Sequence, residues 1–294
     1  MNAGRHSVHL IALLCVSLSG AHTTWAAGQA RAIALTSGKG ISQSPRISPE
    51  GMRIVFVRNS NLWIMNRAGG GRNQLTHFTV VKQLPSGTQH PSWSPDGKRI
   101  VFRAIPSERR GGIFVINVDG SNLTQLTTNW LDDEPDWSPD GQHIVFTSRP
   151  HLWVMEQDGK NAHPLTSGNL DDGVEFSPRW SPKGDQIAYL LGGSGVPKIR
   201  IIGANGENAR SLDVDSYNLA WSQDGKFLYF QYGSPLKTIS AKDGVVIQTI
   251  LDWNKGYENV FDVSPDEKWM VSDFACEDGP CLGSGQIYKL RFPH

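Results

Sequence analysis

Carboxylates are the chemically active side chains that this sequence distributes most unevenly. Lysine plus arginine equals aspartate plus glutamate, at 28 each, yet eleven of the acidic residues fall into four short segments. They are Asp132, Asp133, Glu134 and Asp136; Asp171, Asp172 and Glu175; Asp213 and Asp215; and Asp252 and Glu258. Clustered carboxylates attract basic protein segments, and their oxygens also suit Ca²⁺. The alternative is that Asp is simply common in solvated turns.

Patterns typical of catalysis are missing from the sequence. Ser194 is flanked by glycines but lacks the last glycine of a nucleophile elbow. Residues 38–40 (Gly-Lys-Gly) lack the spacing of a phosphate-binding loop, and no two histidines have the spacing of a zinc protease motif. The balanced charge gives no reason to expect nucleic acid as a partner. We therefore predict a protein that is not an enzyme and that uses neither a metal nor another cofactor.

Two cysteines lie close together near the end of the chain. Cys276 and Cys281 are separated by Glu-Asp-Gly-Pro, and Gly-Pro suits a tight bend. In an oxidising compartment such a pair forms a disulfide that closes a small loop. A redox pair or a metal pair is the alternative, although a metal site usually takes four ligands and no second pair at metal spacing exists. We predict a structural disulfide.

The first 26 residues have the pattern of an export signal. Arg5 and His6 give a weakly basic start, an apolar stretch runs over residues 9–19, and Thr24-Trp25-Ala26 places small residues where a signal peptidase reads them. The apolar stretch is too short to cross a bilayer. We predict a signal peptide over residues 1–26, a periplasmic location without membrane insertion, and a single monomeric domain over residues 27–294.

One sequence unit is copied six times along the chain. Its marker, Trp-Ser-Pro-Asp-Gly followed by a β-branched and aromatic stretch, is clearest at residues 93–102 and 137–146. The shared serines lie 41 to 46 residues apart, at positions 48, 94, 138, 181, 222 and 264. A period of about 40–45 residues with several short strands per unit is typical of β-propellers.

Each unit predicts four strands. Pro-Asp-Gly makes the turn after the first strand, an Asp-Gly or Asn-Gly turn precedes the fourth, and the fourth strand often ends in Leu-Thr. The sixth unit stops after its third strand, whereas residues 31–36 look like a fourth strand without a blade. We therefore predict an all-β, six-bladed propeller in which strand 31–36 completes the last blade and covers its edge.

These motifs resemble the propeller of the TolB family over about residues 31–293. The resemblance implies a periplasmic component of the Tol-Pal cell-envelope system that binds a peptidoglycan-associated lipoprotein. TolB also has an α/β domain ahead of its propeller, which we do not expect here because the repeats begin almost directly after the predicted signal peptide. Related repeats occur in the propeller domains of prolyl-oligopeptidase-type peptidases and of some polysaccharide lyases.

The arrangement of a propeller suggests where the acidic segments lie. Segments that lead from one blade to the next all reach one face, so we expect the carboxylates to form an acidic loop face around the channel mouth, with a basic loop at Arg103, Arg109 and Arg110. Trp130 falls in this face and outside the repeat, which makes it a candidate aromatic anchor. The repeated tryptophans are expected in the core: Trp63, Trp93, Trp137, Trp153, Trp180 and Trp221.

The predicted function is a non-catalytic binding scaffold of the cell envelope. Its partner is an envelope protein or lipoprotein that docks a basic segment on the acidic face. The predicted contact residues are Trp130, Asp132, Asp133, Glu134, Asp171, Asp172 and Glu175. The alternatives are a propeller enzyme, such as a lyase or a hydrolase acting on sugars with or without a metal, and a small-molecule sensor.

Overall fold

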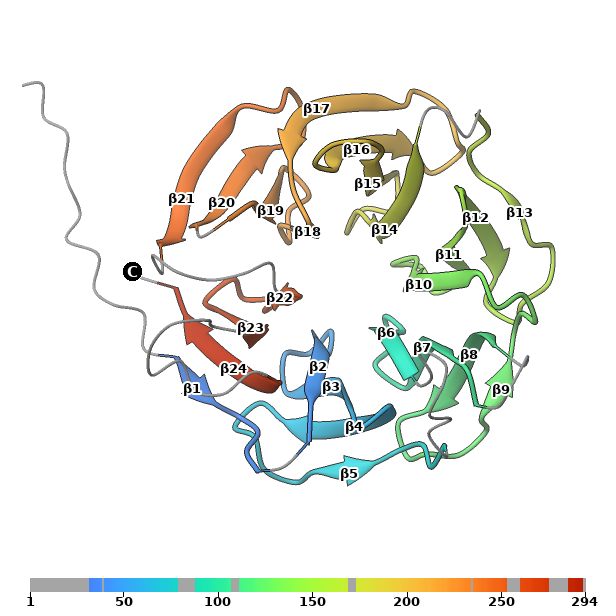
Figure 1. Cartoon of the computed structure of the whole chain (residues 1–294), viewed down its shortest axis with the longest axis vertical. Helices are drawn as coiled ribbons and strands as arrows, with labels where there is room; N and C mark the ends of the chain where they lie inside the picture. The colour runs from blue at the N-terminus through green and yellow to red at the C-terminus, as the bar shows by residue number, and fades with distance from the viewer. Residues whose placement is uncertain are drawn as a thin grey trace, which may run out of the picture.

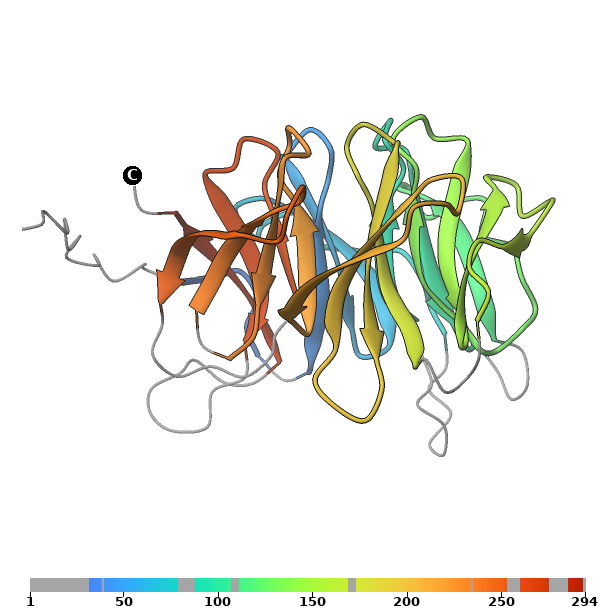
Figure 2. The same ribbon diagram turned by 90° about the horizontal axis from the view of Figure 1, so that it is seen from above.

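Six four-stranded antiparallel sheets form a ring around a central channel (Figure 1). The computed structural model describes residues 32–38, 40–78, 88–106, 111–168, 173–233, 235–252, 260–274 and 285–292, and these ranges contain strands and turns but no helix. None of the described segments is therefore a helix able to span a membrane. Seen edge-on in Figure 2, the ring is a disc whose strands run between its two faces. The predicted six-bladed propeller is confirmed.

The blades follow one another along the chain and are numbered here in that order. Blade 1 contains β2 (Ser42–Ile47), β3 (Arg53–Arg58), β4 (Asn61–Asn66) and β5 (Asn73–Gln74). Blade 2 contains β6 (Thr88–Trp93), β7 (Arg99–Ala104), β8 (Gly112–Asn117) and β9 (Thr124–Gln125). Blade 3 contains β10 (Asp132–Trp137), β11 (His143–Ser148), β12 (His151–Glu156) and β13 (His163–Pro164).

The other three blades complete the ring, with the first strand of each blade at the channel and the fourth at the rim (Figure 1). Blade 4 contains β14 (Val174–Trp180), β15 (Gln186–Gly192), β16 (Lys198–Gly203) and β17 (Arg210–Asp215). Blade 5 contains β18 (Asn218–Trp221), β19 (Phe227–Gln231), β20 (Pro235–Ser240) and β21 (Val246–Asp252). Blade 6 contains β22 (Phe261–Val263), β23 (Trp269–Phe274), β24 (Gln286–Arg291) and β1 (Ile33–Ala34).

The repeated Ser-Pro-Asp-Gly sequence is a self-contained turn between the first and second strands. In blade 2 the Ser94 hydroxyl donates to Asp96 Oδ1 at 2.6 Å and accepts from the backbone N–H of Arg99 at 2.9 Å. Gly97 takes a φ of 65°, a conformation that favours glycine. The carboxylate of this turn therefore bonds within the turn. The serine is buried with its hydrogen bonds satisfied, which explains why it recurs in every repeat.

The Leu-Thr sequence explains why the outer strands of four blades are so short. In these blades the outer strand pairs over two residues only. The threonine hydroxyl that follows it accepts from the backbone N–H of the second residue of the third strand. The pairs are Thr76 with Leu62 at 2.9 Å, Thr127 with Ile113 at 3.1 Å, Thr166 with Leu152 at 3.0 Å, and Thr36 with Ile287 at 2.8 Å. Blades 4 and 5 lack Leu-Thr in this place, and their outer strands β17 and β21 continue for six and seven residues.

The two ends of the described chain meet in blade 6. Strand β1 pairs with β24 in the register Ile33 to Lys289 and Ala34 to Tyr288, and the Leu35 N–H donates to the Ile287 carbonyl at 2.8 Å. The prediction that the segment 31–36 completes the last blade is confirmed. The ladder is shorter than predicted because the Thr36 side chain replaces backbone pairing at its end.

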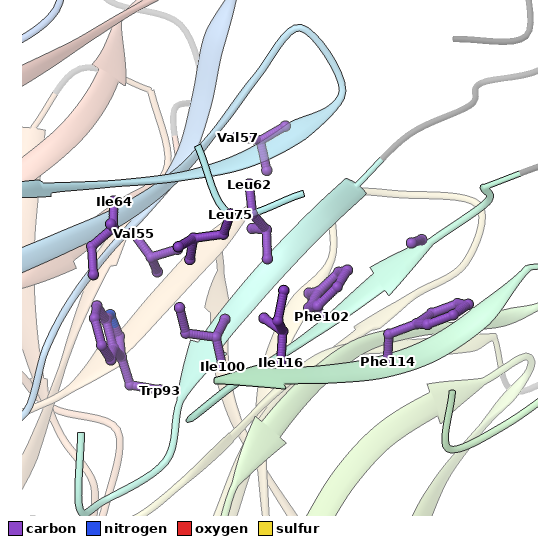
Figure 3. Close-up of a cluster of buried hydrophobic side chains, with 11 residues drawn as sticks. Val55, Val57, Leu62, Ile64, Leu75, Trp93, Ile100, Phe102, Phe114 and Ile116 are labelled. Atoms are coloured by element: carbon purple, nitrogen blue, oxygen red, sulfur yellow. The ribbon is translucent and has the colours of Figure 1, made fainter. Parts of the chain in front are cut away.

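Hydrophobic side chains fill the spaces between blades. Between blades 1 and 2, Val55 and Ile64 face Trp93 and Ile100 (Figure 3), and the Trp93 indole N–H donates to the Arg46 carbonyl at 3.1 Å. The six repeated tryptophans all pack in such clusters, which confirms their predicted core role. Trp93 and Trp137 are buried, whereas Trp63, Trp153, Trp180 and Trp221 are half-buried.

Ring closure should therefore be sensitive to one hydroxyl. Replacing Thr36 with Val leaves the buried Ile287 N–H without an acceptor, which costs about 1–3 kcal/mol of the free energy of unfolding. Urea denaturation measures this loss. Ser37→Ala is the matched control, because Ser37 is exposed and lies one residue further along. Equal stability of the two variants would contradict the role of Thr36 in closure.

Candidate functional site in the central channel

Equivalent side chains from all six first strands line the central channel. The residue two positions before each repeated serine borders one cavity of about 230 Å³. We call these six residues the neck ring. In blade order they are Arg46, Ser92, Asp136, Arg179, Ala220 and Asp262.

The two carboxylates of the neck ring join neighbouring blades. Asp136 accepts from the Ser92 hydroxyl at 2.8 Å and from the Trp180 N–H at 2.9 Å, and Asp262 accepts from the Ile47 N–H at 2.7 Å. Burial raises the pKa of Asp136 to about 6 and also raises the pKa of Asp262, against the opposing effect of these hydrogen bonds. The charge state of Asp136 therefore responds to mildly acidic pH, and burial shifts the pKa of Asp262 in the same direction.

Four of the first strands contain a β-bulge at an X-Pro pair. The residue before the proline has a φ of 49–52°, and the register between the first and second strands shifts at this point. A bulge re-aims side chains and allows proline within a strand. The pairs are Ser44-Pro45, His90-Pro91, Glu134-Pro135 and Ser177-Pro178.

The bulges of blades 2, 3 and 4 assemble a charged cluster near the channel end where the first strands begin. We call it the mouth cluster, and it consists of His90, Arg103, Asp133, Glu134 and Ser177. His90 Nδ1 lies 2.7 Å from Asp133 Oδ1, and Arg103 Nε lies 3.5 Å from Asp133 Oδ2. Glu134 accepts from the Ser177 N–H at 2.7 Å and from its hydroxyl at 3.0 Å. Each contact links one blade to the next.

The His90–Asp133 pair shifts both of its pKa values toward the charged forms. Burial acts to lower the pKa of His90, but the charge and hydrogen bond of Asp133 outweigh it, so the pKa is raised. Burial acts to raise the pKa of Asp133, but His90 and Arg103 outweigh it, so the pKa is lowered. An imidazolium held against a carboxylate is an arrangement that can orient a polar ligand or a protein segment.

The prediction that Asp132, Asp133 and Glu134 lie in a loop between blades is wrong. They open strand β10, where Asp132 is 4% exposed and Glu134 is 9% exposed. Burial raises the pKa of Asp132, whose Oδ1 accepts from the Asn129 side chain at 3.0 Å. Proline at position 135 gave the segment its loop-like pattern, and the bulge absorbs that proline into the strand.

The other residues singled out from the sequence lie in different parts of the chain. Glu175 lies in β14, not in a loop, and accepts from the Leu152 N–H at 3.1 Å and from the Thr166 hydroxyl of blade 3. Asp213 and Asp215 lie in β17. The remaining predicted residues fall outside the described side chains: Asp171, Asp172, Asp252, Glu258, Arg109, Arg110, Cys276 and Cys281. Within the described part of the chain, no three His, Cys, Asp or Glu side chains gather to hold a metal ion.

Trp130 is exposed beside the mouth cluster. Its side chain is 61% exposed, and the adjacent Leu131 is 38% exposed. The segment rests on the backbone of blade 2, since a Cβ at Gly111 would lie 3.3 Å from that of Trp130. Tyr232, which stacks on Tyr217 at 5.9 Å between ring centroids, adds an exposed aromatic ring in blade 5. Trp130 precedes β10, the first strand of blade 3, and Tyr232 follows β19, the second strand of blade 5.

Comparison with known proteins agrees with this architecture. The sequence profile of the TolB β-propeller domain matches residues 28–172. The chain is a TolB-like β-propeller. A TolB homologue of Chlorobium luteolum is 34% identical over 164 residues, and an uncharacterized peptidase of Bacillus subtilis is 24% identical over 243 residues. The alignments cover 53% and 77% of this chain but only 35% and 28% of those relatives.

Solved structures share the fold of this TolB-like propeller across several functions. A putative TolB from Agrobacterium tumefaciens has a TM-score of 0.65 at 16% identity, covering 91% of this chain and 100% of that one. An oligogalacturonate lyase from Vibrio parahaemolyticus has a TM-score of 0.61 at 15% identity over 88% and 80% of the two chains. A gluconolactonase from Xanthomonas campestris gives 0.64 at 14% over 90% and 91%. At these identities the likeness shows the fold alone.

The bonds of Glu134 should make it a stabilising residue of the ring. Truncation by Glu134→Ala removes the acceptor of the Ser177 N–H and hydroxyl and should cost about 1–3 kcal/mol of unfolding free energy. Urea denaturation provides the measurement. Glu207→Ala, in an exposed turn of blade 4, is the matched control and should change stability by under about 0.5 kcal/mol. A Glu134→Ala variant as stable as that control would refute the interblade role.

The His90–Asp133 pair should be visible in a proton NMR titration. The pKa of His90 should lie above the ordinary value of about 6.5, and Asp133→Asn should lower it, whereas Asp158→Asn in an exposed turn should not change it. Because the folded-state pKa is raised, the pair contributes stability that is complete below about pH 6.5 and is lost as the pH rises through that pKa. A His90 titration that is the same in both variants would contradict the pairing.

Proposed function

We propose that this TolB-like propeller is an exported periplasmic scaffold that binds another cell-envelope protein without catalysing a reaction. The observation that supports it most is the exposure of Trp130 and Leu131 on a segment held against the backbone of blade 2. A large aromatic ring on a fixed segment contributes contact area at little entropic cost. The predicted export signal and the resemblance to the TolB family support the location.

The mouth cluster indicates the charge of the partner. Asp133, Glu134 and Glu175 bring three carboxylates to the walls between blades 2, 3 and 4. Three basic side chains lie against them: His90 and Arg103 at Asp133, and His151 at 3.8 Å from Glu175. These carboxylates lie between blades and are little exposed. They therefore act on a partner mainly through long-range electrostatic attraction, not through direct contact. We therefore propose that the partner presents a basic segment, with an apolar contact to Trp130.

A photo-crosslinking experiment tests this proposal at a defined place. A photoreactive amino acid at position 130 should crosslink the mature protein to one envelope protein in whole cells. The same amino acid at position 123, where Leu123 is 45% exposed at a turn preceding an outer strand, is the matched control. Equal crosslinking at both positions, or none at position 130, would overturn the proposed docking surface.

With the partner identified, Trp130→Ala should speed its dissociation at least tenfold, because truncation of a central interface residue costs about 2 kcal/mol or more. Leu123→Ala should leave dissociation unchanged. Association should slow as salt is added, because exposed charges are screened beyond about 8 Å at physiological ionic strength. Surface plasmon resonance measures both rates. Unchanged dissociation on Trp130→Ala would contradict its role as an anchor.

An enzyme remains the second candidate function, and the His90–Asp133 pair is the observation that favours it. A histidine hydrogen-bonded through Nδ1 to a carboxylate is oriented for proton transfer at Nε2. Such an enzyme, acting on sugars for example, would lose turnover on His90→Gln while retaining its fold. The scaffold proposal expects no turnover to lose, and expects Trp130→Ala to affect binding instead.

A further inference from the structure

The neck ring has an approximate two-fold pattern of charge. Its order around the channel is Arg, Ser, Asp in blades 1–3 and Arg, Ala, Asp in blades 4–6. Two guanidinium groups and two carboxylates make the ring neutral when both carboxylates are ionised. The difference between the halves is one hydroxyl, which Ser92 has and Ala220 lacks.

The Ser92 hydroxyl completes the hydrogen bonding of Asp136 in one half of the ring. In blades 1–3 the Ser92 hydroxyl donates to Asp136, whose other oxygen accepts from the Trp180 N–H, so both oxygens are engaged. In blades 4–6 Asp262 has the equivalent backbone bond through Oδ2, from Ile47. Its Oδ1 lies 4.0 Å from Arg46 Nη1, and the backbone N–H of Val263 also bonds to this carboxylate. Ala220 has no hydroxyl to donate, so Asp262 lacks the interblade hydroxyl bond that Asp136 has.

The guanidinium groups of the ring also have spare hydrogen-bonding capacity. Arg46 is 8% exposed, and the described residues give it one hydrogen bond, to the Phe261 carbonyl at 3.1 Å. Arg179 donates to the Pro178 carbonyl at 2.7 Å, while its Nε is buried without an acceptor among the described residues. A guanidinium has five N–H donors, so each retains donors that can bind a carboxylate at the cavity.

The cavity is matched to a small organic ion. Its volume of about 230 Å³ compares with about 30 Å³ for one water molecule in the liquid. Ala220 lies between Arg179 and Asp262 in the order of the blades, and all three residues border this cavity. A cationic and an anionic side chain in one cavity favour a ligand that carries both charges. The two carboxylates of the ring repel a simple anion, and its two guanidinium groups repel a simple cation.

We infer that the neck ring binds a small aminocarboxylate zwitterion over Ala220, with its carboxylate at Arg179 and its ammonium group at Asp262. Such a site is separate from the mouth cluster and from the docking surface around Trp130. It makes the propeller a receptor for a small molecule in addition to any protein that it binds. The failure of either proposal leaves the other standing, because the variants used are different.

Calorimetric titration of the mature protein tests the inference directly. The probes are glycine, β-alanine and 4-aminobutyrate, which differ in the spacing of their charges, with acetate, methylammonium and inorganic phosphate as single-charge controls. The titrations are run at about pH 8 and equal ionic strength, because burial raises the pKa of both ring carboxylates and a higher pH favours their ionised forms. At least one aminocarboxylate should bind about ten times more tightly than any control. Binding of acetate or phosphate with equal affinity would overturn the inference in favour of a simple anion site.

Two variants test whether the zwitterion binds at Ala220 and Arg179. Ala220→Ser restores the hydroxyl that Asp136 already has in the other half, so it should weaken zwitterion binding at least tenfold without lowering the melting temperature. Arg179→Gln should weaken it at least as much, while Arg67→Gln on an exposed turn should have no effect. Failure of every aminocarboxylate to bind, or binding that neither Ala220→Ser nor Arg179→Gln changes, would refute the site.

Discussion

The pairing of β1 with β24 is the constraint on which the ring depends. All other blades are built from consecutive strands, whereas blade 6 takes its outer strand from the opposite end of the chain. The same seam is joined again near the channel, where Asp273 accepts from the Ser44 N–H at 2.8 Å and Asp262 accepts from the Ile47 N–H at 2.7 Å. These bonds join the first strand of blade 1, β2, to the first and second strands of blade 6, β22 and β23, which continues the channel wall across the seam.

At the end of the first strand of each blade, one position is structural and another, two residues earlier, varies from blade to blade. The repeated serine keeps its role in every blade because its hydroxyl satisfies a local backbone N–H. The position three residues later keeps a positive φ, with glycine in five blades and Glu267 in the sixth. The residue two positions before the serine faces the cavity instead, and no local bond fixes its type. It is Arg, Ser, Asp, Arg, Ala or Asp depending on the blade. Interblade bonding uses some of these side chains, and the remaining donors and acceptors are what a ligand meets.

The fold was predictable from the sequence because its signals are local. The turn after the repeated serine recurs in all six blades, because the serine hydroxyl accepts from the backbone N–H five residues later whichever residues lie between. Leu-Thr ends a strand with a hydroxyl that its own blade uses. The candidate site was less predictable. Asp132, Asp133 and Glu134 precede Pro135 and have the pattern of a loop, yet the positive φ of Glu134 turns the proline into part of a bulge within β10. Arg46 and Arg179 gave no signal because comparison of the repeats favours positions that stay the same, whereas these vary while occupying one geometric place.

The long separation between the partners in blade 6 has a consequence for the order of assembly. Thr36 and Ile287 are 251 residues apart, whereas every other blade is closed by contacts between strands adjacent in the sequence. Five blades can thus form from contacts between residues close in the sequence. The pairing of β1 with β24 joins residues far apart in the sequence, so it forms after the blades between them. In a chain made from its N-terminus, β1 is made before the other described strands and its partner β24 after them. The pairing of β1 with β24 can therefore form only once β24 has been made.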